Sequence, residues 1–362
     1  HKLNKAIDVM KRLAVVLPNR AREFYMRIAE LALLAYRDEL ALSYVKKALK
    51  MSKGDAYGWA RIARIYEKKE DYAAAIKAFK KALEIRPRYF KVHFDLAKIY
   101  LRQGQHLQAS ELYHEVVQRS PEEHLVSKAG ALAVDLDEYL GRLEEFEREL
   151  IPLAFTYTHK PVYRKLLVKV YSRMIPALVR KKRYASSAAE RDAAKKKLKD
   201  IGSRALKPLL ESLSSDSRKN KLIAVDLLGY LGNPGAAPTL VRLALNPPED
   251  EDSSLGFLNS GASRSVAPST RFRRRRRRRI KPKKDNREEK RKLEFKVRAL
   301  VAAGRLSNPR TVKDLVKLLK ADEVAVRETA AWALALIATP STQRGLMGAL
   351  EDRKIGVQSM AC

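Results

Sequence analysis

Histidine is the side chain best suited to acid–base and metal chemistry near neutral pH, and this sequence holds six. They are His1, His93, His106, His114, His124 and His159. No two of them stand at the spacing that places paired metal ligands on one face of a helix. Phosphate loops, dinucleotide-binding fingerprints and nucleophile elbows are also missing from the sequence. We therefore expect no catalytic, cofactor-binding or metal site. The protein is then not an enzyme, unless catalytic residues lie outside this stretch of chain.

A second candidate for chemistry is an unbroken run of arginines from Arg273 to Arg279. Between Arg271 and Lys292 there are 15 basic and 3 acidic residues, enough positive charge to attract phosphates without reading bases. Phe272 is the only aromatic residue in the arginine cluster, so no series of rings is present to stack on bases, and any nucleic-acid binding should be sequence-tolerant. The candidate polyanion-binding residues are Arg271, Arg273, Arg274, Arg275, Arg276, Arg277, Arg278, Arg279, Lys281, Lys283 and Lys284.

The whole chain is basic, with a formal net charge of +33 over 362 residues. Such a charge favours anionic partners such as nucleic acid, acidic protein segments or an anionic membrane surface, and the alternative is that it serves solubility. The single cysteine, Cys362, excludes a disulfide framework and suits a cytoplasmic location. No apolar stretch reaches the roughly 18 residues that a membrane helix needs. Since the sequence begins at His1 rather than Met, we expect it to be a piece of a longer protein.

The first third of the chain repeats every 34 residues, and such a period predicts a stack of similar units. Trp59, Tyr66, Ala75, Phe79, Ala82 and Pro87 are followed 34 positions later by His93, Tyr100, Ala109, Tyr113, Val116 and Pro121. The pattern resembles the tetratricopeptide repeat (TPR) family, in which each repeat is a pair of antiparallel helices. We expect repeats over residues 22–55, 56–89 and 90–121, after a partial repeat over 1–20.

One repeat cannot bury its own apolar face, so the repeats should stack into a superhelix with a concave groove. The TPR resemblance implies that the first helix of each repeat lines this groove. The matching residues, which we predict to bind a partner, are Tyr57, Arg61, Arg64, Lys68, Lys91, Phe94, Lys98 and Arg102. Their chemistry favours an acidic peptide, and the alternative is a solvated helix face. The asparagines of the family's carboxylate-clamp pattern are absent at Arg64 and Lys98, so that activity is not expected.

A shorter repeat follows in the last third of the chain. An apolar residue, two spacers and a proline recur at Leu231–Pro234, Leu306–Pro309 and Ile337–Pro340. Asn233, Asn308 and Thr339 can each cap the helix that follows, and proline suits the first turn of a helix. The segments resemble HEAT repeats, particularly the short repeats of the phycobilisome-lyase type. Some HEAT-like enzymes bind iron through His–Glu pairs. Because this part holds no histidine, the resemblance implies the fold and not that activity.

The proline spacing also locates an insertion. Pro309 and Pro340 are 31 residues apart, whereas Pro234 and Pro309 are 75 apart. The excess falls between a helix ending near Leu245 and one starting near Lys290. This stretch, about 247–290, is rich in Pro, Ser and Gly and contains the arginine run, a composition typical of disordered chain. We expect an insert that the surrounding helices do not need.

Residues 122–203 are helical by pattern but lack the 34-residue signature, and we expect them to connect the two repeat arrays. The predicted fold is all-α, an α-α superhelix. A TPR solenoid (1–121) is followed by the helical connector (122–203) and a HEAT-repeat solenoid (204–362) with a disordered basic insert.

The predicted function is a non-catalytic scaffold or adaptor that mediates protein–protein interactions and complex assembly through two α-solenoids. Its partners are expected to be other proteins, especially their acidic segments, and no cofactor is expected. The alternative is sequence-tolerant binding of nucleic acid or another polyanion through the basic surface and the arginine-rich loop.

Overall fold

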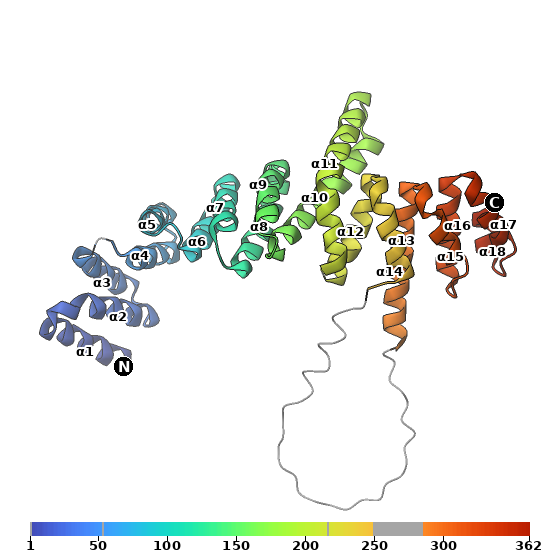
Figure 1. Cartoon of the computed structure of the whole chain (residues 1–362). Helices are drawn as coiled ribbons and strands as arrows, with labels where there is room; N and C mark the ends of the chain where they lie inside the picture. Colours follow the sequence, from blue (N-terminus) through green and yellow to red (C-terminus); the bar gives the residue numbers. More distant parts are fainter. Residues whose placement is uncertain (1, 53, 216, 249–284) are drawn as a thin grey trace, which may run out of the picture. The chain divides into compact units, whose positions relative to one another are not determined.

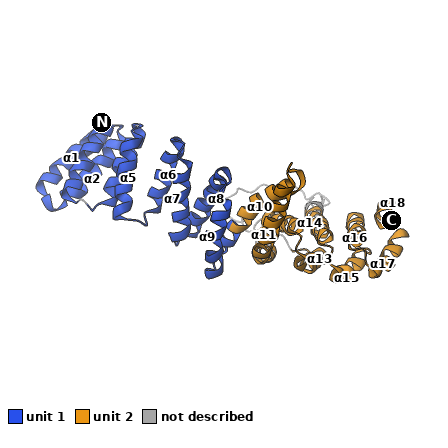
Figure 2. Cartoon of the chain, turned by 90° about the horizontal axis from the view of Figure 1, so that it is seen from above, with its two compact units in different colours: residues 1–166 blue, residues 167–362 orange. Residues whose placement is uncertain are grey.

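The computed structural model describes residues 2–52, 54–215, 217–248 and 285–362. Within these ranges every regular element is a helix and no strand occurs (Figure 1), so the all-α prediction is confirmed for them. By their contacts the residues divide into two compact units, 1–166 and 167–362 (Figure 2). The boundary falls inside the segment that we predicted to be a connector, and the division into three parts stays a prediction.

Unit 1 is a series of antiparallel helix pairs. Its helices are α1 (Lys2–Val16), α2 (Ala21–Leu34), α3 (Asp38–Met51), α4 (Ala56–Lys68), α5 (Tyr72–Ile85), α6 (Phe90–Arg102), α7 (His106–Arg119), α8 (Glu123–Leu140) and α9 (Leu143–Thr156), with a 3-10 turn η1 (Pro18–Arg20). The pairs α2/α3, α4/α5 and α6/α7 occupy the three expected repeats. Helix α10 (Pro161–Tyr184) then crosses into unit 2.

Small side chains allow the two helices of each repeat to approach closely. Ala41 on α3, Ala75 on α5 and Ala109 on α7 are fully shielded from solvent. Phe79, on α5 like Ala75, is equally buried. Because interiors are packed almost without voids, a larger group at any of these alanines would have to displace a neighbouring helix.

The turns that end and begin the helices are set by a few residues. The Asp55 Oδ1 atom accepts hydrogen bonds from the backbone N–H groups of Tyr57 (3.0 Å) and Gly58 (3.1 Å), which caps α4. Asp71 caps α5 in the same way through the N–H of Ala74 (3.1 Å). Gly104 separates α6 from α7 with φ at +71°, a left-handed conformation that glycine adopts without strain. The expected turns between paired helices are therefore present.

Unit 2 continues with helices that follow the shorter repeat. They are α11 (Ala188–Ser215), α12 (Arg218–Leu231), α13 (Ala237–Leu245), α14 (Asp285–Leu306), α15 (Val312–Leu318), α16 (Val324–Ile337), α17 (Pro340–Leu350) and α18 (Ile355–Ala361). The 3-10 turns η2 (Pro234–Ala236) and η5 (Pro309–Thr311) precede α13 and α15. The Oδ1 atom of Asn233 accepts a hydrogen bond from the backbone N–H of Gly235, and that of Asn308 accepts one from Arg310, both at 3.0 Å. These side chains therefore cap the 3-10 turns rather than the α-helices that follow.

At the third copy Thr339 and Thr342 form a capping box, in which each side chain accepts from the backbone N–H of the other residue. The backbone N–H of Thr339 donates to the Oγ1 atom of Thr342 at 3.1 Å, and Pro340 is the first residue of α17. The three prolines thus stand at the first position of a helical turn, as their sequence context predicted.

The helices on either side of the predicted insert pack as one array. Arg218 on α12 forms an ion pair with Glu294 on α14 (2.7 Å), and Asn308 donates to the carbonyl of Pro234 (2.8 Å). Helix α14 begins at Asp285, ahead of the start near Lys290 that the sequence indicated. An ion pair between Glu288 and Lys292 (2.8 Å), one helical turn apart, stabilises the first turns of α14. The arginine run itself lies in 249–284, outside the described residues.

Replacing Ala75 with Leu should overpack the interface between α4 and α5, costing about 1–3 kcal/mol of unfolding free energy. Ala73 is an exposed alanine on the same helix, so Ala73→Leu is the matched control and should change little. Urea unfolding followed by Trp59 fluorescence, in a Trp332→Phe background, reports on unit 1. An unchanged midpoint for Ala75→Leu would contradict the helix packing described above.

Unit 2 gives a parallel test at Gly229. A Cβ added there would lie 2.9 Å from both the Cα and the Cβ of Ala302, so α12 and α14 would have to separate. We expect Gly229→Ala to destabilise unit 2 although alanine favours helices. Gly348→Ala on α17 is the control, since nothing lies within 4 Å of its added Cβ, and it should be neutral or stabilising. Trp332 fluorescence during urea unfolding, in a Trp59→Phe background, measures both; equal midpoints for the two variants would contradict this packing.

Candidate functional site

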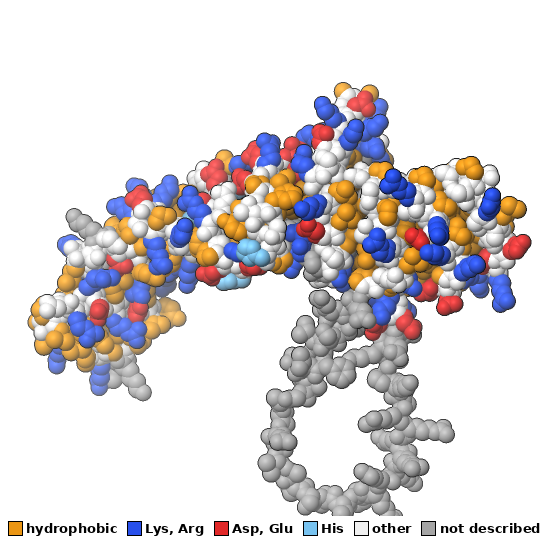
Figure 3. Space-filling view, viewed as in Figure 1, with side chains coloured by type: hydrophobic (Ala, Val, Ile, Leu, Met, Phe, Trp, Pro, Cys, Tyr) orange, Lys and Arg blue, Asp and Glu red, His pale blue; other side chains and the backbone are white. Residues whose placement is uncertain are grey.

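The eight residues predicted to line a groove lie on two first helices of successive repeats. Tyr57, Arg61, Arg64 and Lys68 are on α4, and Lys91, Phe94, Lys98 and Arg102 are on α6. Lys and Arg side chains are also scattered over the rest of the visible surface of both units (Figure 3). The surroundings of these eight residues, rather than positive charge alone, must therefore set this face apart.

Ion pairs join the first helices of neighbouring repeats, and we call this set the ionic ladder. The guanidinium of Arg61 on α4 pairs with Glu30 on α2 and also donates to the carbonyl of Met26 (3.1 Å). On the other side of α4, the Nε atom of Arg64 donates to the Oδ2 atom of Asp95 on α6 at 2.9 Å. Both pairs join residues 31 apart, one helical turn short of the repeat length. Much of the predicted positive charge therefore holds the repeats together.

Helix α6 carries positive charge in excess of its partners. Lys98 and Arg102 share one carboxylate, that of Glu67 on α4, at 3.5 and 3.6 Å. Their side chains are 60% and 45% exposed, and Lys91 makes no ion pair within the described part of the chain. We name Lys91, Lys98 and Arg102 the α6 cations. They are the predicted groove residues with charge left for a partner, whereas Lys68 is paired with Asp38 at 2.9 Å.

The two predicted aromatic residues are partly packed within the repeats. The ring of Tyr57 lies 5.0 Å from that of Tyr89, and its hydroxyl accepts a hydrogen bond from Arg86 at 2.8 Å. The ring of Phe94 lies 5.6 Å from that of Tyr113, with the Nζ atom of Lys128 5.0 Å from its centre. Tyr57 is still 54% exposed, so an aromatic surface remains beside the ladder.

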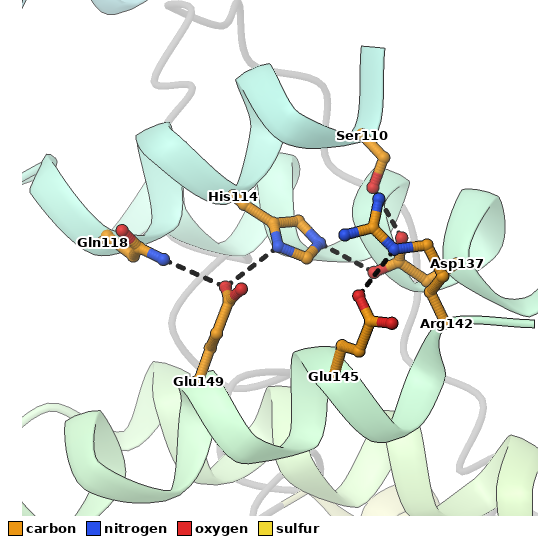
Figure 4. Close-up of polar contacts among 7 residues, drawn as sticks. All are labelled: Ser110, His114, Gln118, Asp137, Arg142, Glu145 and Glu149. Carbon is orange, nitrogen blue, oxygen red and sulfur yellow. Dashed lines mark hydrogen bonds and ion pairs between the residues drawn. The ribbon is translucent and has the colours of Figure 1, made fainter. Parts of the chain in front are cut away.

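A buried polar network, which the sequence analysis missed, lies between α7, α8 and α9 (Figure 4). The Nε2 atom of His114 is 2.7 Å from the Oδ2 atom of Asp137, and its Nδ1 atom is 2.9 Å from Glu149. Ser110 donates to the other Asp137 oxygen at 2.6 Å. Gln118 completes the network by donating to Glu149 at 3.0 Å. Ser110 and His114 are four residues apart and share a helix face, which was the available signal.

Both ring nitrogens of His114 face carboxylates, and this arrangement decides the charge of the ring. Burial alone would lower the pKa of His114, but the hydrogen bonds to Asp137 and Glu149 outweigh it and raise the pKa from 6.5 to about 9. The hydrogen bond from His114 lowers the pKa of Glu149 in turn. The imidazole is therefore a cation at neutral pH, with both N–H groups donating.

Serine, histidine and aspartate in one network suggest a hydrolase triad, but the geometry is different. Ser110 donates to Asp137 and not to His114, and its side chain is fully buried. A doubly protonated imidazole cannot take a proton from a nucleophile, and the triad needs a serine–histidine hydrogen bond. This network therefore holds α7 against α8 and α9 rather than performing acyl transfer.

The search for other chemical sites covers only the residues that the structure describes. In that part of the chain, no three or more His, Cys, Asp or Glu side chains gather where a metal could bind. His93 is buried, with its Nε2 atom 3.2 Å from Glu115. No helix in the same residues is both long and apolar enough to cross a membrane.

Comparison with protein families agrees with the two repeat types. Residues 39–90 and 68–133 match tetratricopeptide repeat models, and residues 288–361 match a model of HEAT repeats. The chain thus carries TPR repeats in unit 1 and HEAT repeats in unit 2. The second TPR match runs into α8, past residue 121.

No curated protein matches the chain. Solved structures similar to it include MamA from Desulfovibrio magneticus RS-1 (19% identity, 54% of this chain and 97% of that one, TM-score 0.31). Another is PilW, a widely conserved type IV pilus biogenesis factor (15% identity, 66% of this chain and 98% of that one, TM-score 0.30). A third is a tetratricopeptide repeat protein from Parabacteroides merdae ATCC 43184 (12% identity, 71% of this chain and 91% of that one, TM-score 0.35). Likeness at this level carries no argument about partners.

The charged His114 gives the fold a pH dependence. Because its pKa is raised, it contributes stability that is fully present below pH 6.5 and is lost as the pH rises through about 9. Over this pH interval we expect the unfolding free energy of the wild type to fall by roughly 3 kcal/mol more than that of the His114→Gln variant. Urea unfolding by Trp59 fluorescence across that range measures the difference. The control is His124→Gln, an exposed histidine, which should follow the wild type; a His114→Gln variant that also follows it would contradict the assigned network.

Proposed function

We propose that this protein is a non-catalytic scaffold that assembles a complex by holding other proteins on its two arrays of helical repeats. TPR repeats generally bind proteins, and the network most like a catalytic site lacks the geometry for catalysis. The single exposed cysteine, Cys362, is compatible with a cytoplasmic location, which we propose as well.

The α6 cations support a more specific proposal, namely that unit 1 takes an acidic segment of its partner. Helix α6 carries three exposed cations, of which Lys98 and Arg102 share the one carboxylate of Glu67 on α4. A carboxylate arriving from a partner can pair with Lys91, or with the nitrogens of Lys98 and Arg102 that Glu67 does not saturate. The paired Arg61 and Arg64 fix the spacing of α2, α4 and α6 and thus position the binding helix.

Binding of nucleic acid remains the alternative. Its main support was the arginine run, which lies outside the described residues. The described surface adds positive charge, and charge alone binds phosphates without sequence preference. The groove residues include the rings of Tyr57 and Phe94, which pack on protein neighbours. We therefore rank the acidic protein segment ahead of the polyanion.

The test is binding of a fluorescent peptide of alternating Glu and Ser, measured by anisotropy at two salt concentrations. We expect the double variant Lys98→Gln/Arg102→Gln to bind it about tenfold more weakly, because two attractions are lost. The matched control, Lys5→Gln/Arg12→Gln, removes two exposed cations of α1 that have no ion pairs in the described structure, and should bind like the wild type.

Two results would contradict the proposal. Equal affinity for the two double variants would show that the α6 cations are not a specific site. Tighter binding of a single-stranded RNA, unaffected by Lys98→Gln/Arg102→Gln, would favour the polyanion alternative. Circular dichroism of each variant verifies that the helices are retained.

A further inference from the structure

Helix α4 has a second face, opposite the ionic ladder. Arg61, Arg64 and Lys68 lie on one side of the helix, and a period of about 3.6 residues places Trp59, Ile62 and Tyr66 on the other. A cleft of about 460 Å³ opens over these three side chains, between α3 and α5. The cleft is in the size range of ligand pockets, and none of the predicted groove residues lines it.

The floor of this cleft is apolar and the rim is basic. Ile62 and Ala78 are buried, and Trp59, Tyr66 and Ala74 are half-exposed along the floor. The rim carries four lysines and one acid: Lys46 from α3, and Lys77, Lys80, Lys81 and Glu84 from α5. The Nζ atom of Lys81 lies 4.6 Å from the centre of the Trp59 ring, a cation–π contact that keeps this charge over the floor.

The lysines of the rim differ from the cations of the ladder in having no acidic partners. Within the described residues none of the four forms an ion pair, although Glu84 is close enough in sequence to Lys80 and Lys81 to do so. Their charges are therefore not used to hold repeats together. Four cations with one acid around an apolar floor are complementary to a ligand that is acidic outside and apolar at its centre.

We propose that this cleft docks an acidic, amphipathic segment of a partner protein. An apolar side chain of the segment, such as Leu or Phe, packs on Trp59 and Ile62. Flanking Asp or Glu carboxylates pair with Lys46, Lys77 and Lys80. Phosphate alone would leave the floor unfilled, and an apolar peptide would leave the lysines unpaired. This site is separate from the α6 cations, so a partner can occupy either one without the other.

Trp59 makes the proposal directly testable, because the chain has only two tryptophans. In the full chain with Trp332→Phe, Trp59 is the single reporter of the cleft. A synthetic peptide of Glu, Asp and Leu is titrated, with a Leu-free peptide of Glu, Asp and Ser as its control. We expect the Leu-containing peptide to shift Trp59 emission to shorter wavelength and to bind at least about tenfold more tightly than the Leu-free peptide, because only leucine fills the apolar floor.

Charge variants complete the experiment. The double variant Lys77→Glu/Lys80→Glu should bind the Leu-containing peptide at least about tenfold more weakly, because it reverses two charges of the rim. It leaves the contact between Lys81 and Trp59 in place. Lys98→Gln/Arg102→Gln should leave the emission shift unchanged, which separates this site from the one under Proposed function. Circular dichroism melting verifies that both variants fold.

Three outcomes would overturn the proposal: no emission change at saturating peptide, equal affinity for the Leu-containing and Leu-free peptides, or an affinity unaffected by Lys77→Glu/Lys80→Glu. A shift of Trp59 emission by inorganic phosphate alone, or by vesicles containing anionic lipid, would also overturn it, because the ligand would then not be a protein segment.

Discussion

The distance at which two helices of one repeat can pack governs the rest of this structure. In unit 1 that distance is set by alanine, at Ala41, Ala75 and Ala109, all without solvent exposure. In unit 2 a glycine limits the distance between neighbouring repeats instead, since a Cβ on Gly229 of α12 would lie 2.9 Å from the Cα and Cβ of Ala302 on α14. Close pairs present a regular apolar surface, so neighbouring pairs stack through nearest-neighbour contacts. The ionic ladder and the cleft at Trp59 both exist because α4 sits in register with the helices beside it.

The sequence predicted those features that depend on neighbours along the chain. Helix pairs follow from the 34-residue period, and the helical turns that begin at Pro234, Pro309 and Pro340 follow from the prolines, since caps and turns are local. The ladder was out of reach of the same comparison. Alignment at 34 residues compares equivalent positions, whereas the pairs join residues 31 apart. Looking for opposite charges at that second spacing would have found Glu30 with Arg61 and Arg64 with Asp95. The His114 network was missed because Asp137 and Glu149 lie beyond the last clear repeat.

The same count of basic residues therefore means different things at different places. On α4 the arginines are neutralised by acids of adjacent helices, and such partly exposed pairs contribute modestly each but act together. On α6 the cations outnumber their acidic partners, and around the Trp59 cleft the lysines form no ion pair with any residue that the structure describes. A net charge of +33 gave the sign of the expected partner but no location for it. The proposed sites for a partner are the places where the fold leaves cations without enough acidic partners.

The packing of α13 against α14 has a consequence for how this chain can evolve. These helices lie on either side of the residues 249–284, and Asn308 bonds back to Pro234 across the same interval. The helix before this interval and the helix after it are thus held together by their own contacts. The array therefore keeps its register when sequence between α13 and α14 is gained, lost or exchanged. Domains or tags can be grafted there for the same reason.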